Sequence, residues 1–271
     1  MYRHLHKTMV IGLVFCCAVA WADRARGQTD RSAASKATSA PAPTKARILL
    51  LHHSTGECIW NGGVAAWFDA YNKAGHTEYR ITEQNFPKSE PYGWKNYPYD
   101  YWNIWVRHAG DKPYQTEPTL EMLTHQYDVI VFKHCFPVSA IEPDTGKADV
   151  ADEDKRIENY KLQYAALKKK LHEFAKTKFI LWTGAALVEG ETDEAAAGRA
   201  RAFFDWVRSE WDQPGDNIYL WDFHALETEG GLYLKADYAS GDSHPNERFS
   251  KMVAPLLGRR IVDVICGAGD S

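Results

Sequence analysis

The stretch ARILLLHHSTG at residues 46–56 sets the fold, because a continuous apolar run there ends in polar residues and a glycine. An apolar run without alternation is typical of a parallel strand that is buried on both faces. We therefore expect a first strand at residues 46–52 with a sharp turn after it. Ser54 lies at the tip of that strand, and Gly56 can adopt the positive φ that such a turn often requires.

Strand and helix patterns alternate along the chain downstream of this stretch. Further strands are predicted at residues 78–84, 128–133, 179–183 and 218–221. Helices are predicted at residues 60–74, 101–106, 120–126, 154–176 and 195–211. A last helix is expected to begin at Pro245, and Pro255 should kink or break it. This alternation predicts an α/β fold, a three-layer sandwich with a central, mostly parallel sheet.

The N-terminal segment has the features of an export signal. Arg3 and Lys7 precede an apolar run of about thirteen residues, and the sequence AWA at residues 20–22 fits a cleavage site. The apolar run is shorter than the roughly 20 residues that a membrane span needs, so we expect no stable membrane insertion after signal removal. Residues 1–22 are therefore predicted to be a signal peptide, and the protein to be secreted or periplasmic.

The remainder is predicted to be a linker followed by one domain. Residues 23–45 are rich in Ala, Ser, Thr and Pro without apolar periodicity, which is typical of a disordered linker. Residues 46–271 have the length of one domain. The formal net charge is −4 and no long basic block occurs, which argues against a nucleic acid as a partner.

Cysteine and histidine spacing gives no support for a metal site. No CxxC or HExxH motif occurs, so we expect neither a metal nor another cofactor. Cys58, Cys135 and Cys266 follow the signal segment. In an oxidising compartment one pair can be bridged, and we predict a disulfide between Cys58 and Cys135 because each follows a central strand by a few residues.

Polar residues at strand ends are the candidates for chemistry, because open parallel sheets bind ligands at the carboxyl edge. Ser54 would be exposed there, with backbone N–H groups of its turn aimed at a developing oxyanion. Asp242 lies two residues before His244, and such residues share a face in an extended segment. Asp242 would then orient one ring nitrogen of His244, and the other would accept the Ser54 proton. Taken singly, either segment has a simpler interpretation as a turn or a helix cap.

With Ser54 after the first strand and Asp242 and His244 close together before the last helix, the sequence resembles the SGNH/GDSL hydrolases over about residues 47–264. This order differs from that of the α/β-hydrolases, whose nucleophile lies in a GxSxG motif, because position 52 here is His. The resemblance implies the flavodoxin-like SGNH hydrolase fold and a serine esterase that needs no cofactor. It also implies that Ser54, Asp242 and His244 are the catalytic residues.

Two motifs depart from the family pattern. The usual Gly-Asp-Ser is HHS at residues 52–54, and the usual Asp-x-x-His is the shorter Asp242-x-His244. The shorter spacing resembles that of periplasmic polysaccharide O-acetyltransferase relatives. An O-acyltransferase acting on polysaccharide therefore stays an alternative to hydrolysis.

The family's oxyanion hole is also incomplete in this sequence. The strand ends that normally supply a Gly and an Asn read KHC at residues 133–135 and TGA at residues 183–185, so the Asn is missing. Gly56 and His134 are the candidate oxyanion donors, and Lys133 is an alternative to His134. The missing Asn keeps open a catalytically inactive SGNH-like carbohydrate-binding protein as a further alternative.

A second Asp-x-His lies at residues 222–224, directly after the last predicted strand. We favour Asp242 and His244 because the acid and base of the family come from the loop before the final helix. Asp222 is expected to organise a loop, and His224 is expected to have no catalytic role.

Aromatic side chains crowd residues 92–105. Tyr92 and Trp94 lie in a proline-containing loop and are the candidates for exposed rings that stack on a sugar, whereas Trp102 and Trp105 have helical spacing. The predicted activity is hydrolysis of short-chain acyl esters, acetyl above all, carried on carbohydrate and cleaved through an acyl-Ser54 intermediate. The expected partner is a small-molecule or polysaccharide ester.

Overall fold

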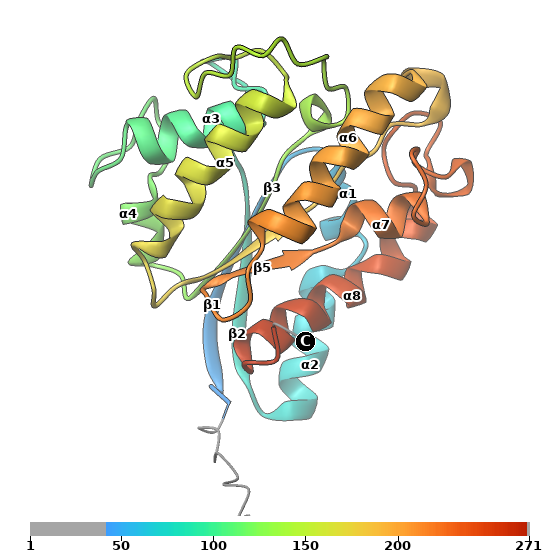
Figure 1. The fold of residues 1–271 in the computed structure, drawn as a ribbon. Coiled ribbons are helices and arrows are strands. Elements are labelled where there is room, and N and C mark those ends of the chain that lie inside the picture. The colour runs from blue at the N-terminus through green and yellow to red at the C-terminus, as the bar shows by residue number, and fades with distance from the viewer. Residues whose placement is uncertain (1–41, 270–271) are drawn as a thin grey trace, which may run out of the picture. The chain divides into compact units, whose positions relative to one another are not determined.

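The computed structural model describes residues 42–269, and they contain a five-stranded parallel sheet between two layers of helices (Figure 1). The strands are β1 Lys45–His52, β2 Glu78–Asn85, β3 Val129–Lys133, β4 Lys178–Trp182 and β5 Ile218–Trp221. Their order is β2-β1-β3-β4-β5, and every neighbouring pair is parallel. The predicted three-layer α/β sandwich is confirmed. The predicted signal peptide and most of the predicted linker lie outside the described residues.

The apolar run that begins the fold forms β1, next to the central strand β3. Ile48 and Leu50 pack on one face of the sheet, and Leu49 and Leu51 on the other. All four are essentially inaccessible to solvent, which is why the run lacks a polar alternation. Because β1 is buried on both faces, its polar end can only emerge at the carboxyl edge of the sheet.

Two helical layers cover the sheet. One contains α1 Thr55–Asn61, α2 Val64–Gly75 and α8 Glu247–Ile265. The other contains α3 Pro98–Trp102 with a π-helical turn Asn103–Arg107, α4 Leu120–Thr124, α5 Ile157–His172, and α6 Glu194–Trp206 with a π-helical turn Val207–Trp211. The short helix α7 Phe223–Thr228 directly follows β5 and was not expected from the sequence. Single 3-10 turns occur at Phe136–Val138, Glu189–Glu191 and Ala236–Tyr238. Within the described residues no helix is both long and apolar enough to cross a bilayer.

The helix predicted at residues 60–74 is divided into α1 and α2 by two glycines. Gly63 has a φ of 113°, a value that favours glycine. A Cβ on Gly62 would lie 2.4 Å from the carbonyl oxygen of Ser250 in α8, so only glycine allows α8 to approach this closely. Tertiary packing therefore ends α1 where the apolar periodicity continues.

The last helix, α8, differs from the prediction at Pro245 and at Pro255. It begins after Asn246, whose side chain accepts a hydrogen bond from the Phe249 N–H (2.9 Å), and it continues through Pro255 to Ile265. The predicted break is wrong because buried side chains on both sides of Pro255, including Val253 and Leu257, hold the helix against the sheet. Packing of that apolar face outweighs the hydrogen bond that proline removes.

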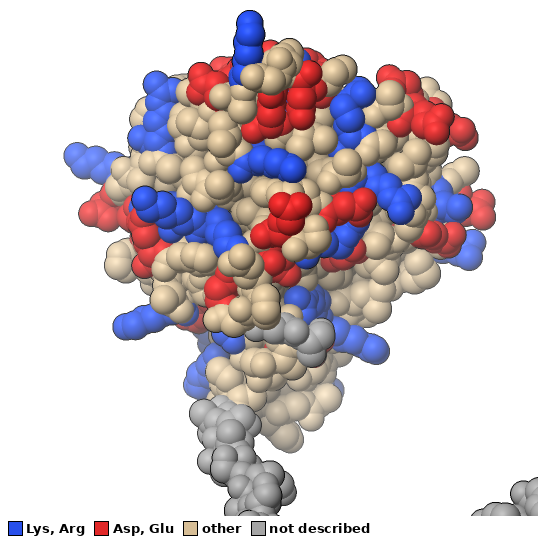
Figure 2. All heavy atoms as spheres, in the orientation of Figure 1, with Lys and Arg blue, Asp and Glu red and all other residues tan. Residues whose placement is uncertain are grey.

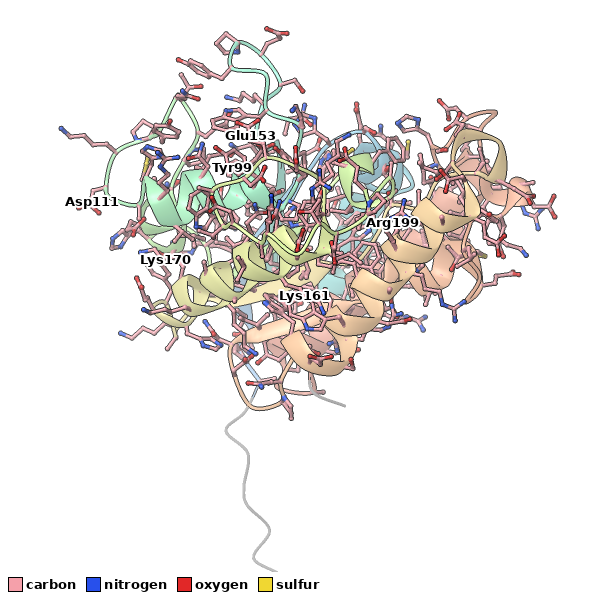
Figure 3. The ribbon with its side chains drawn as sticks, turned by 45° about the horizontal axis from the view of Figure 1, so that its top comes forward. Tyr99, Asp111, Glu153, Lys161, Lys170 and Arg199 are labelled. Carbon is pink, nitrogen blue, oxygen red and sulfur yellow. The ribbon has the colours of Figure 1, made fainter. Side chains whose placement is uncertain are left out.

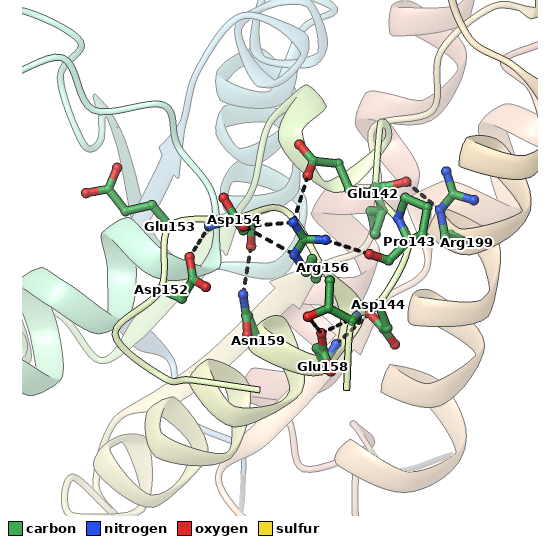
Figure 4. Close-up of polar contacts among 12 residues, drawn as sticks. Glu142, Pro143, Asp144, Asp152, Glu153, Asp154, Arg156, Glu158, Asn159 and Arg199 are labelled. Atoms are coloured by element: carbon green, nitrogen blue, oxygen red, sulfur yellow. Dashed lines mark hydrogen bonds and ion pairs between the residues drawn. The ribbon is translucent and has the colours of Figure 1, made fainter. Parts of the chain in front are cut away.

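A long irregular segment joins β3 to α5 and is held in place by arginines (Figure 4). Arg156 donates to the Pro143 carbonyl (2.7 Å) and to the Asp154 carboxylate (2.8 Å). Arg199, on α6, donates to the carbonyl of Ile141 (2.6 Å). These bonds fix the chain that leaves the carboxyl end of β3, beside the candidate site.

Helices α5 and α6 lie side by side in the helical layer that also contains α3 and α4 (Figure 3). The Phe203 ring of α6 packs against Tyr160 and Tyr164 of α5, and Lys161 lies 5.1 Å from the centre of the Trp206 ring. On the face drawn in Figure 2, acidic and basic side chains are interspersed.

Candidate active site

Ser54 lies between the end of β1 and the start of α1, in an unusual backbone conformation. Its φ is 42° and its ψ is −94°. A non-glycine residue in a sparsely populated region costs about 1–3 kcal/mol and persists only where the surroundings enforce it. The positive φ expected at Gly56 is found instead at Ser54, so that expectation is wrong. Gly56 is required for another reason, because a Cβ there would lie 2.3 Å from the Cβ of His52.

The two histidines before Ser54 anchor the end of the strand. His52 is buried, and its Nε2 lies 2.5 Å from Glu83 Oε2 on β2. The His53 ring bonds to the carbonyl oxygen of Pro87. The His53 carbonyl in turn accepts the Gly56 N–H (2.7 Å). His52 and His53 therefore tie the turn of Ser54 to the neighbouring β2 and to the loop that follows it.

The structure brings the three predicted catalytic residues together. Ser54 Oγ lies 2.6 Å from His244 Nε2, and His244 Nδ1 lies 3.0 Å from Asp242 Oδ2. Asp242 also accepts hydrogen bonds from the backbone N–H of His244 (2.9 Å) and from Ser240 Oγ (3.0 Å). These bonds lower the pKa of Asp242 to about 2, and the bond from the His244 N–H has the largest effect. Asp242 is therefore ionised at neutral pH, and its charge faces the imidazole.

The loop that carries Asp242 and His244 is fixed on several sides. Ser243 is buried, accepts the Val188 N–H (3.0 Å) and donates to Glu191. The ring of Phe136 meets the His244 ring edge-on, with 5.3 Å between the ring centres. Sequence reasoning missed Phe136, although its position just after β3 is where a residue of the carboxyl edge belongs.

The oxyanion donors differ from the expectation. Gly56 N–H is occupied by the His53 carbonyl, so Gly56 is not a free donor. Cys135 N–H likewise donates to the Asn96 carbonyl (2.7 Å). Ser54 N–H makes no hydrogen bond with any residue in the range 42–269, which leaves it available at the turn.

His134 is not brought to Ser54. It is buried among the rings of Tyr101, Phe132 and Tyr164, and burial lowers its pKa well below the usual value. The reason is the alternation of a strand, which places residue 134 on the opposite face from residues 133 and 135. The assignment of His134 as an oxyanion donor is therefore wrong.

The two aromatic candidates for sugar stacking differ in exposure. Tyr92 is exposed as expected, but Trp94 has an exposed fraction of only 9% and packs beside Tyr114. The loop folds inward because Asp100 accepts the N–H groups of both Lys95 and Asn96 (2.7 Å each). The assignment of Trp94 as an exposed ring is therefore wrong.

The second Asp-x-His has another role. Asp222 accepts hydrogen bonds from Thr183 (2.7 Å), from Arg208 (3.0 Å) and from the N–H of Ala225 at the start of α7. His224 is buried against Phe204, and burial lowers its pKa to about 4. Asp222 therefore caps α7, where the sequence had suggested that it organises a loop.

All three cysteines of the described residues are free thiols, so the predicted Cys58–Cys135 disulfide is wrong. Cys135 instead directs its Sγ to Ser54 Oγ, at 3.8 Å. Burial raises the pKa of Cys58. Within residues 42–269 no group of three His, Cys, Asp or Glu side chains is arranged to hold a metal ion.

A cavity of about 590 Å³ is lined by residues that precede and support the loop of Asp242 and His244. Its lining includes Val188, which bonds to Ser243, and Tyr238, whose carbonyl accepts the N–H of Asn246. Tyr233, Glu229 and Lys235 also line it. The same backbone segments thus form this cavity and support the loop of His244.

No family model and no curated protein matches this chain. One similar solved structure is a gut microbial diltiazem-metabolizing enzyme, with a TM-score of 0.46, 12% identity, and coverage of 81% of this chain and 47% of that one. Another is a carbohydrate esterase whose active site displays divergent catalytic and non-catalytic binding functions, with a TM-score of 0.36, 13% identity, and coverage of 82% and 69%. This chain therefore spans about half the length of the first protein. Neither similarity assigns it to a family.

Proposed function

We propose that this protein hydrolyses short-chain acyl esters through an acyl-Ser54 intermediate. The observation that carries the proposal is the hydrogen-bonded series in which Ser54 Oγ lies 2.6 Å from His244 Nε2 and His244 Nδ1 lies 3.0 Å from Asp242. A nucleophile in contact with a base that is itself oriented by a carboxylate is the arrangement that acyl transfer requires.

The proposed reaction has two halves. His244 accepts the Ser54 proton as Ser54 Oγ attacks the ester carbonyl, and Ser54 N–H stabilises the resulting oxyanion. The tetrahedral intermediate collapses, and His244 gives its proton to the departing alcohol. Water, activated by His244, then attacks the acyl-enzyme and releases the acid. Asp242 stays ionised throughout and stabilises the imidazolium.

The openness of the site supports a large polar substrate with a short acyl group. The side chains of His244 and Asp242 are 33% and 55% exposed, so the reacting atoms are accessible to a bulky alcohol. Glu57 and Arg248 are exposed residues close in sequence to Ser54 and His244. Such polar groups can orient hydroxyls but would lose their hydration beside a long alkyl chain. We therefore propose an acetyl group on a carbohydrate, met outside the cytoplasm if residues 1–22 act as a signal peptide.

The nucleophile is tested by replacing Ser54 with alanine. Turnover of an aryl acetate should fall by at least about 10⁴-fold, while the far-UV spectrum stays the same. Ser209→Ala, at an exposed serine whose hydroxyl donates to the Asp205 carbonyl of the preceding helical turn, is the control and should keep full activity. A fluorophosphonate probe should label a peptide that contains Ser54. Full turnover by Ser54→Ala would refute the proposal.

The substrate class is tested with acetate, butyrate and octanoate esters and with an acetylated polysaccharide. Specificity constants should fall as the acyl chain lengthens. Specificity constants that rise from acetate to octanoate would contradict the short-acyl proposal. Product analysis with an added sugar acceptor separates hydrolysis from acyl transfer, since transfer would yield an acylated acceptor in place of free acid.

A further inference from the structure

Lys133 lies at the carboxyl end of β3, the central strand, and is completely buried. Its ammonium nitrogen is 3.5 Å from the carbonyl oxygen of His53. It also lies 5.9 Å from the centre of the Trp182 ring on β4. A buried lysine is unusual because removing an ammonium group from water is costly unless the group finds partners.

The groups that face Lys133 come from four elements. Glu227 of α7 is fully buried, Cys58 belongs to α1, Cys135 follows β3, His52 ends β1 and His53 follows it. Glu227 accepts the Ala186 N–H (2.7 Å), and no carboxylate among the described residues forms an ion pair with Lys133. Burial accordingly lowers the pKa of Lys133. The closest acceptor recorded for its ammonium is therefore a backbone carbonyl.

That carbonyl belongs to the peptide unit that also contains Ser54 N–H. The His53 oxygen accepts from Lys133 Nζ at 3.5 Å and from Gly56 N–H at 2.7 Å, while Ser54 N–H is left without a partner among the described residues. Donors on the carbonyl side polarise an amide and strengthen its N–H as a donor. They also fix the strained turn that aims this N–H.

We propose that Lys133 is a positioning residue that polarises and holds the His53–Ser54 peptide, so that Ser54 N–H is a stronger oxyanion donor. This inference rests on the proposed esterase function. It explains how a site without the oxyanion Asn of the resembled family stabilises a tetrahedral intermediate. Because the charge acts through the peptide, it lowers the barrier of the chemical step and leaves substrate affinity unchanged.

Charge on Lys133 makes the activity pH-dependent. When Lys133 loses its proton at alkaline pH, the polarisation weakens and kcat falls, which gives an alkaline limb to the pH profile. The thiols of Cys58 and Cys135 and the buried Glu227 face the same ammonium. Variants at these three residues distinguish their effect on the pH profile from that of Lys133. Cys58→Ala and Cys135→Ala should each keep the limb. Burial raises the pKa of Glu227 well above its usual value. At alkaline pH, where Glu227 is ionised, its charge raises the pKa of Lys133, so Glu227→Gln should move the limb to lower pH.

The decisive variant is Lys133→Met, which keeps the length of the side chain and removes both the charge and the donor. For hydrolysis of an aryl acetate we expect kcat to fall by roughly 10- to 100-fold, KM to stay within about 2-fold, and the alkaline limb to disappear. Lys133→Arg should restore part of kcat and keep it to high pH, because guanidinium does not lose its proton there.

A folded Lys133→Met enzyme with wild-type kcat and an unchanged alkaline limb would overturn the inference. If that variant does not fold, the wild-type profile decides: absence of an alkaline limb up to pH 11, or its loss in either cysteine variant, would overturn it as well. Ser54→Ala keeps the two proposals apart. An active Ser54→Ala enzyme refutes the esterase itself, whereas an inactive one beside an unimpaired Lys133→Met refutes only the role of Lys133.

Discussion

Asp222-Phe223-His224 and Asp242-Ser243-His244 have the same spacing in the sequence but different backbones and different partners. The first copy begins helix α7, where Asp222 caps the helix and His224 is buried. The second lies in a loop before α8, where Asp242 and His244 are bonded to each other and His244 reaches Ser54.

The backbone explains the difference. In a helix, side chains two residues apart point about 200° apart around the axis, so Asp222 turns toward the helix start while His224 turns toward the core. Residues 241–244 instead form a bend, in which the Asp242 carboxylate accepts the backbone N–H of His244 (2.9 Å) and lies 3.0 Å from Nδ1 of its ring. The extended segment expected from the sequence is therefore wrong, although the two side chains do meet.

The largest expected difference between the two copies is in catalysis. His244→Ala should lower kcat/KM for an aryl acetate by about 10³- to 10⁴-fold, because the proposed general base is lost. The matched variant His224→Ala should stay within about 3-fold of wild type once the folded fraction is measured. Steady-state kinetics on both variants tests this prediction. If His224→Ala were inactive and His244→Ala active, our assignment of the two histidines would be reversed.

The next effect is on the pH dependence of stability. The folded-state pKa of His224 is about 4, below its usual value of 6.5, so the unfolded chain binds an extra proton between these pH values. Stability is therefore lost as the pH falls from about 6.5 to about 4, by roughly 3 kcal/mol for this residue. His52, whose pKa is also lowered to about 4, adds to the same trend.

The variant His224→Phe should flatten that part of the curve, as measured by urea unfolding at several pH values. Phe204→Leu, which shortens the ring that packs on His224, is the control and should lower stability without changing its slope against pH. An unchanged slope in His224→Phe would show that folding does not lower the pKa of His224.

A smaller effect is expected at Asp242. Asp242→Asn removes the charge that faces the imidazole and should lower kcat by roughly 10- to 100-fold with little change in KM. The loss should be modest because the Asp242 side chain is 55% exposed and water can partly replace it. The matched Asp222→Asn should change kcat by less than about 3-fold. Equal losses in kcat for the two variants would remove the distinction between the copies.

The smallest effect concerns the cap of α7. Asp222→Ala removes an N-cap acceptor and the partner of Arg208 and should lower the free energy of unfolding by about 1–2 kcal/mol. Asp242→Ala, in the exposed loop, should lower it by less. Thermal unfolding of both variants tests this order, and a greater loss of stability in Asp242→Ala would contradict it.

Much of the fold was predictable because buried positions of a strand or helix are occupied by apolar residues in the sequence. The apolar runs of β1 and of residues 179–182 in β4 were recognised because side chains buried on both faces must all be apolar. The order of Ser54 before Asp242 and His244 was equally visible. Errors arose where a distant contact decided the outcome, as at Gly62 against α8 and at Pro255, whose helix is held by its packing.

The sequence by itself determined the alternation of strands and helices, the strand tip that carries Ser54 and the loop that carries Asp242 and His244. The tertiary structure alone decided which groups meet there. It showed His134 facing away from Ser54, Lys133 beneath the His53 carbonyl, and free thiols at Cys58 and Cys135. The physical reason is that local patterns record which face of an element is buried, whereas contacts between residues some 80 or 190 positions apart depend on sheet order and register.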